Sequence, residues 1–140
     1  MIKHIVFDFG GVILDLDGVH TGYPDDLAEI FSVSIDEAKK IWDENKSLVM
    51  TGQESPRQFL ERMKDELSLN FDVAKGVAFW EERNFITKER IDWKLVKFFE
   101  QLRNNYQVHM LTDQIQLNNG ASEWKHEFEE HFHTIFRSYE

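Results

Sequence analysis

One stretch near the amino terminus constrains the fold more than any other. Residues 5–13 read Ile-Val-Phe-Asp-Phe-Gly-Gly-Val-Ile. Three apolar residues in a row, β-branched or aromatic, predict a short buried strand. Asp8 ends that run, and a carboxylate at the end of a buried strand is costly unless solvent, a partner or a metal compensates it. Gly10 and Gly11 then let the backbone turn sharply, with amides able to face an anion.

This stretch resembles the first motif of the haloacid dehalogenase-like (HAD) hydrolases, in the subgroup whose motif reads Asp-x-Gly-Gly-Val. In that family the nucleophilic Asp ends the first strand of a Rossmann-like sheet, so the resemblance makes Asp8 the nucleophile. Asp15, followed by Asp17, offers a second register for the motif. That register would put the two glycines inside a strand, which weakens it, and would leave residues 2–7 without a role. We therefore prefer Asp8, with Asp15 and Asp17 on the loop that leads away from the site.

Helix signals dominate the next seventy residues. Ser34 begins a capping box, and Ser55 followed by Pro56 repeats the start signal. Apolar residues, Leu48 and Leu67 among them, recur at roughly helical spacing and predict the core of a helical bundle. The expected helices run from Asp25 or Asp26 to Phe31, from Ser34 towards Gly52, from Pro56 to about Leu67, and from about Asp72 to Asn84.

Strand signals return near the end of the sequence. An amphipathic helix over 91–102 precedes a strand over 106–111, a helix over 123–131 follows, and 132–136 begins a third strand. This order predicts an α/β fold with a parallel sheet, after a first strand at residues 1–8. The resemblance implies an incomplete Rossmann-like HAD core, formed by 1–16 and 88–140, with an inserted α-helical cap over 17–87.

The site expected from this topology lies where strands end. Ligands of open α/β sheets bind outside the carboxyl ends of the strands, so Asp8 and Thr112 should face one pocket. In the family, the second strand ends in a Ser or Thr that binds the transferred phosphoryl group. The resemblance therefore implies Asp8 as the catalytic residue and phosphate contacts from Phe9, Gly10, Thr112 and Asp113. It also implies Mg²⁺ held by the Asp8 carboxylate and the Gly10 carbonyl.

The implied activity is Mg²⁺-dependent hydrolysis of a small phosphorylated metabolite through an aspartyl-phosphate on Asp8. Two departures from the family pattern weaken the prediction of that activity. Gly10 stands where most phosphatases of the family place their general acid and base. The family's Lys motif and second acidic motif do not occur within the 140 residues, so we expect a C-terminally shortened member with little or no turnover. The alternative is a non-catalytic HAD-derived module for binding or assembly.

Net charge and composition limit which classes of binding partner and which cell compartment we expect. A net charge of −10 argues against nucleic acid and anionic membranes, which require a cationic face. The sequence has no Cys, no secretory signal and no long apolar run, so we expect a cytoplasmic protein. His126, His131 and His133 lie near several acids, and we interpret them as a solvated helix end rather than a metal site.

The resemblance also predicts how copies of this chain interact. In the family sheet the first strand is central, whereas here residues 2–7 would be paired on one side only. An apolar strand with a free edge invites another chain. We therefore expect a homodimer, or a complementing chain, that pairs through the first strand.

Overall fold

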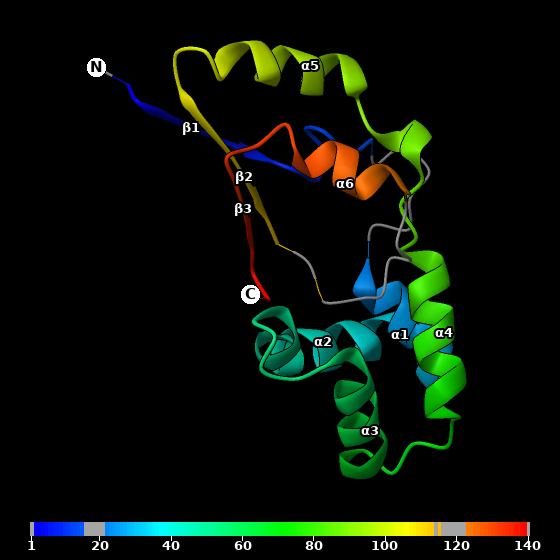
Figure 1. Ribbon diagram of the computed structural model, residues 1–140. Helices are drawn as coiled ribbons and strands as arrows, with labels where there is room; N and C mark the ends of the chain where they lie inside the picture. Colours follow the sequence, from blue (N-terminus) through cyan, green and yellow to red (C-terminus); the bar gives the residue numbers. More distant parts are fainter. Residues whose placement is uncertain (1, 16–21, 114, 116–122, 140) are drawn as a thin grey trace. The chain divides into compact units, whose positions relative to one another are not determined.

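The computed structural model describes residues 2–15, 22–113, 115 and 123–139 of an α/β chain (Figure 1). The described residues fall into two compact units, each with its own hydrophobic core. The first unit takes the described residues of Met1–Asp17, Ile86–Asp113 and Gly120–Arg137, and the second those of Gly18–Phe85, Gln114–Asn119 and Ser138–Glu140. None of the described helices is both long and apolar enough to cross a membrane.

The first unit is built on a three-stranded parallel sheet, which confirms the predicted fold class. Its strands, in the spatial order β1-β2-β3, are β1 (His4–Asp8), β2 (Gln107–Thr112) and β3 (Thr134–Arg137). The helices of this unit are the short 3₁₀ helix η1 (Lys88–Arg90), α5 (Trp93–Leu102) and α6 (Glu123–Glu129). β1 begins at His4, three residues after the predicted start at residue 1, and Ile2 and Lys3 lie outside it.

The two faces of this sheet differ. On one face, Val108 and Met110 are buried in the core with Phe99 of α5 and Phe128 of α6, and Phe7 stacks on Phe99 with ring centroids 3.7 Å apart. Side chains alternate along a strand, so the neighbouring residues lie on the opposite face. We call that second face the open face, and its side chains include His4, Val6, Asp8, His109, Leu111 and Phe136. Three of its apolar side chains are about half exposed: Val6 54%, Leu111 54% and Phe136 49%.

Among the described residues, the second unit is a bundle of four helices, and three of them begin where the sequence places the start signals. They are α1 (Tyr23–Phe31), α2 (Ile35–Met50), α3 (Pro56–Glu66) and α4 (Val73–Arg83). Ser34 and Asp72 each accept a backbone N–H in the first turn of their helices. Ser55 forms a complete capping box with Gln58. α1 begins two residues earlier than the earliest predicted start, with Pro24 in its first turn.

The core of the helical unit centres on aromatic rings. Trp80 is fully buried, and its ring lies within 6.3 Å of the rings of Tyr23, Trp42 and Phe59. Two leucines that the spacing assigned to apolar stripes are instead exposed, Leu48 at 40% and Leu67 at 44%. Leu48 is one step of about 100° around the helix from the fully buried Val49, and Leu67 lies past the last turn of α3 as its C-cap.

Gly52 illustrates how a single backbone position constrains the helical unit. Its φ is +68°, and a Cβ built there would lie 2.2 Å from the carbonyl oxygen of Tyr139. Replacing Gly52 by Ala is therefore expected to lower the free energy of unfolding by more than about 1 kcal/mol, through left-handed strain and displacement of Tyr139. Urea denaturation measures the loss. Gly10→Ala is the control, because a Cβ at Gly10 meets no heavy atom within 4 Å. Equal stability of the two variants would contradict this reading of Gly52.

Candidate active site at the carboxyl ends of β1 and β2

The register of the sheet brings three predicted site residues to one edge. Asp8, the last residue of β1, pairs with Leu111 of β2, and Thr112 and Asp113 follow Leu111 directly. Neighbouring parallel strands lie about 4.8 Å apart. Asp8, Thr112 and Asp113 are therefore neighbours at the carboxyl ends of adjacent strands, where open α/β sheets bind ligands.

The side chains of Asp8 and Thr112 lie on opposite faces of the sheet. Asp8 is exposed on the open face. Thr112 is 4% exposed and belongs to the alternation of Val108 and Met110, which face the core. A ligand that contacts both side chains must therefore lie beyond the strand ends rather than over either face.

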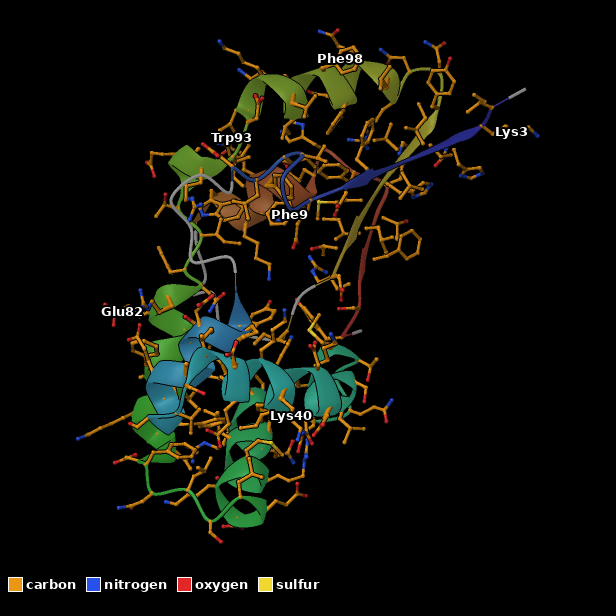
Figure 2. All side chains as sticks on the ribbon, turned by 180° about the vertical axis from the view of Figure 1, so that it is seen from behind. Lys3, Phe9, Lys40, Glu82, Trp93 and Phe98 are labelled. Atoms are coloured by element: carbon orange, nitrogen blue, oxygen red, sulfur yellow. The ribbon has the colours of Figure 1, made fainter. Side chains whose placement is uncertain are left out.

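The chain leaves β1 through a tight turn that begins at Phe9 (Figure 2). The Phe9 carbonyl accepts the backbone N–H groups of Ile13 at 3.0 Å and Leu14 at 2.9 Å. Gly11 adopts a φ of 71°, which favours glycine, and its N–H donates to the Leu14 carbonyl. Phe9, Ile13 and Leu14 are buried, so they anchor a turn that keeps Gly10 exposed.

The backbone N–H of the next residue orients the Asp8 carboxylate. The Phe9 N–H donates to Asp8 Oδ1 at 2.7 Å. The sequence predicted that the Phe9 amide would contact phosphate, and in this structure that N–H already has an acceptor. Gly10 has open space where a side chain would start, so room for a ligand lies next to the nucleophile candidate.

Asp15, the alternative motif aspartate, lies in a different structural environment from Asp8. It follows an isolated antiparallel bridge between Leu14 and Ile91, and not a strand of the parallel sheet. Its N–H donates to the Arg90 carbonyl at 2.8 Å, and Arg90 Nη2 donates to its carbonyl at 2.6 Å. Asp17 lies outside the described residues. β1 ends at Asp8, as the preferred register predicts, whereas the nucleophilic role of Asp8 stays a prediction.

The sequence pattern does not mark Arg90 as a cation near this turn. A cavity of about 490 Å³ lies between residues 11–15 and 89–92, and Arg90 is part of its lining. Arg90 reaches this place through the bridge between Leu14 and Ile91, which joins segments more than seventy residues apart. The sequence carries no local pattern that marks such a pairing.

The oxygen atoms near Asp8 are of the kind that Mg²⁺ prefers. Mg²⁺ is usually held by one or two carboxylates, keeps several waters and binds substrate phosphate. The exposed Asp8 carboxylate and the Gly10 carbonyl fit that pattern as a partial ligand set. Among the described residues, no group of three or more His, Asp or Glu side chains is arranged to hold a metal ion.

The histidines near the carboxyl end of the sequence contact different partners. His126 Nε2 lies 3.4 Å from Glu130, and His131 Nδ1 lies 3.6 Å from Glu100 of α5. His133 Nδ1 accepts the backbone N–H of Val108 at 3.0 Å. Each of the three rings is thus directed at its own neighbour.

Comparison with known proteins identifies the fold. Neither the protein-family models nor the curated proteins give a match. Among solved structures, the chain is similar to a HAD-family enzyme from Bacteroides thetaiotaomicron in a magnesium complex, with a TM-score of 0.65 and 18% identity over 99% of this chain and 68% of that one. It is also similar to a predicted HAD-like hydrolase from Porphyromonas gingivalis (TM-score 0.59, 16% identity, 99% and 67%). A third similar structure is a 2-haloacid dehalogenase from Pseudomonas syringae (TM-score 0.54, 16% identity, 99% and 64%).

These similarities establish that the chain has the fold of HAD-family enzymes. The three proteins share 16–18% of their residues with the chain, a level at which the fold is shared and the activity must be argued from the site. The chain covers about two thirds of the length of each of them.

Proposed function

We propose that this chain is a hydrolase of small phosphate monoesters that uses Asp8 as its nucleophile. The observation that carries the proposal is an exposed carboxylate at the carboxyl end of β1, beside Thr112 and the open space at Gly10. The fold supports the same conclusion, because the Bacteroides enzyme has also been solved with magnesium and inorganic phosphate.

The proposed reaction begins with attack by Asp8 Oδ2 on the phosphorus atom. The bond between phosphorus and the ester oxygen breaks, and the leaving alcohol takes a proton from water. Water then attacks the phosphorus of the aspartyl-phosphate, the bond to Asp8 breaks, and inorganic phosphate leaves. The Phe9 N–H binds Oδ1, so the attack is assigned to Oδ2.

The same edge of the sheet holds the phosphate in this proposal. The Thr112 hydroxyl and the Gly10 amide would bind its equatorial oxygens, and Asp113 would lie next to Thr112 at the rim. The Asp8 carboxylate and the Gly10 carbonyl would hold Mg²⁺, which when bound neutralises charge on the phosphate. The helical unit would act as the cap that selects the substrate.

Turnover by this chain is expected to be slow. In the part of the chain that the structure describes, Asp8 has no ion-pair partner, and each missing charge stabiliser costs about a hundredfold or more in rate. The sensitive test is Mg²⁺-dependent release of inorganic phosphate from p-nitrophenyl phosphate and a panel of sugar phosphates. We expect slow release that EDTA abolishes. Binding of phosphate with Mg²⁺ and no release would favour the alternative, a non-catalytic binding module.

Gly10 offers a way to raise the rate. The position tolerates a side chain, because a Cβ there meets no heavy atom within 4 Å and φ is not in the left-handed region. Gly10→Asp would place a carboxyl group two residues from Asp8, where it can donate a proton to the leaving group. General acid catalysis contributes about 10²- to 10⁴-fold when the leaving group needs a proton, so we expect hydrolysis of a sugar phosphate, which releases an alkoxide, to rise at least about tenfold.

Gly10→Asn is the matched control for that variant. It has nearly the same size and polarity but cannot donate a proton as an acid. A rate for Gly10→Asp that does not exceed the rate for Gly10→Asn would show that Gly10 does not face the leaving group.

A further inference from the structure

Leu14 connects the turn after β1 to a second segment of the same unit. It forms an isolated parallel bridge with Gly10 and an isolated antiparallel bridge with Ile91. Its N–H donates to the Phe9 carbonyl at 2.9 Å, and its carbonyl accepts the Gly11 N–H at 3.0 Å. In a parallel bridge, the residue between those two groups directs its own N–H and carbonyl to the other side. Leu14 therefore directs the N–H and carbonyl of Gly10 away from itself.

The segment that faces Leu14 is anchored to α5. The Asp92 N–H donates to the Ile13 carbonyl at 2.9 Å, on one side of the antiparallel bridge. The Asp92 carboxylate accepts the N–H groups of Lys94 and Leu95 in the first turn of α5. α5 in turn packs in the core of the first unit. The turn after β1 is thus connected through Leu14 to a helix of the core.

The side chain of Arg90 completes the hydrogen bonds on the other side of this bridge. The Asp15 N–H donates to the Arg90 carbonyl at 2.8 Å. In a regular antiparallel ladder, the Arg90 N–H would donate back to the Asp15 carbonyl. The Arg90 N–H instead donates to the Thr87 carbonyl at 3.2 Å, at the end of the short helix η1. Arg90 Nη2 takes its place and donates to the Asp15 carbonyl at 2.6 Å.

We propose that Arg90 is a positioning residue for the candidate site. Its guanidinium holds Asp15, which holds the neighbouring Leu14 against the turn, and Leu14 keeps the N–H and carbonyl of Gly10 available to a ligand. This role rests on the proposed function, which assigns the Gly10 amide to phosphate. The hydrogen bonds that carry it are present without a ligand, so they can be tested separately.

Amide hydrogen exchange followed by NMR tests the positioning without any ligand. A hydrogen bond from a charged donor is stronger than a neutral one, so Arg90→Ala should speed the exchange of the Gly11 and Leu14 amides by about tenfold. The amides of β2 should keep their rates. Lys88→Ala is the matched control, because Lys88 is a cation of the same short helix whose Nζ contacts Glu127 at 2.7 Å. Unchanged exchange in Arg90→Ala, or equal acceleration in both variants, would overturn the proposal.

Titration with inorganic phosphate and Mg²⁺, followed by the NMR shift of the Gly10 amide, tests the consequence for binding. Apparent affinity falls with the fraction of molecules in the binding conformation, so the dissociation constant of Arg90→Ala should rise by about threefold. Arg90→Lys should restore most of the affinity, because an ammonium group can donate to the same carbonyl. Phosphate that binds neither the variants nor the unmodified chain would contradict the proposed function, and the exchange rates would still decide the positioning.

Salt separates positioning from direct attraction of phosphate by the Arg90 charge. Raising KCl from about 0.05 M to about 0.5 M screens an exposed charge strongly but leaves a hydrogen-bonded backbone in place. We expect the ratio of the dissociation constants of Arg90→Ala and the unmodified chain to be the same at both concentrations. A ratio that falls to one at the higher concentration would show that Arg90 acts on phosphate through its charge, and would overturn the positioning role.

Discussion

Replacing Asp8 by Asn is expected to lower Mg²⁺-dependent hydrolysis of p-nitrophenyl phosphate by about 10³-fold or more. An amide oxygen is a poor nucleophile, and loss of a nucleophile removes the covalent route as a whole. The substitution keeps the size of the side chain and an acceptor for the Phe9 N–H at Oδ1. Phosphate release measured with purified protein, together with circular dichroism as a check on folding, gives the result.

Asp15→Asn is the matched control for that variant. Asp15 lies seven residues further on, and its backbone pairs with Arg90 rather than with the parallel sheet. We expect its rate to stay within about twofold of the unmodified chain, well under the effect of losing a nucleophile. A large loss in Asp15→Asn with activity retained in Asp8→Asn would show that the second register of the motif is the functional one.

Truncation of Trp80 is expected to have the largest effect on stability. Its side chain is fully buried at the centre of the aromatic cluster of the helical unit. Replacing a buried aromatic residue by Ala costs about 3–5 kcal/mol, because contacts are lost and a cavity remains. Trp80→Ala should therefore lower the urea midpoint of unfolding, and amide hydrogen exchange should increase throughout α1–α4.

Phe85→Ala is the control for Trp80. Phe85 follows α4 and is 47% exposed, so its truncation is expected to change the free energy of unfolding by less than about 1 kcal/mol. Equal losses for the two variants would mean that the ring cluster around Trp80 does not dominate the stability of the helical unit.

The features that the sequence predicted well have local causes. The cap at Ser55 depends on residues within three positions, and the end of β1 at Asp8 depends on a change from apolar to acidic residues. The parallel sheet followed from the order of the elements. Leu48 and Leu67 were misplaced because spacing locates an apolar stripe only to within about one residue. Asp26, expected at the start of a helix, is 1% exposed and accepts a hydrogen bond from Asn84, a contact across 58 positions.

In the candidate site, too, some features could be predicted from the sequence and others depend on contacts between distant residues. The topology was enough to predict that Asp8 and Thr112 lie at one edge of the sheet, because parallel strands end on the same side. Their side chains lie on opposite faces because Asp8 pairs with Leu111, and no local sequence pattern encodes this register. The hydrogen bond from the Phe9 N–H to Asp8, and the position of Arg90, depend on how the turn folds back on itself.

Asp8 is proposed to accept a phosphoryl group, and chemical trapping of that group tests this role. The chain is incubated with acetyl phosphate and Mg²⁺ and reduced with borohydride, which converts an aspartyl-phosphate to homoserine, and the peptides are then read by mass spectrometry. We predict homoserine at position 8 and none at position 15. Homoserine at position 15, or none at either position in a folded sample, would contradict the claim.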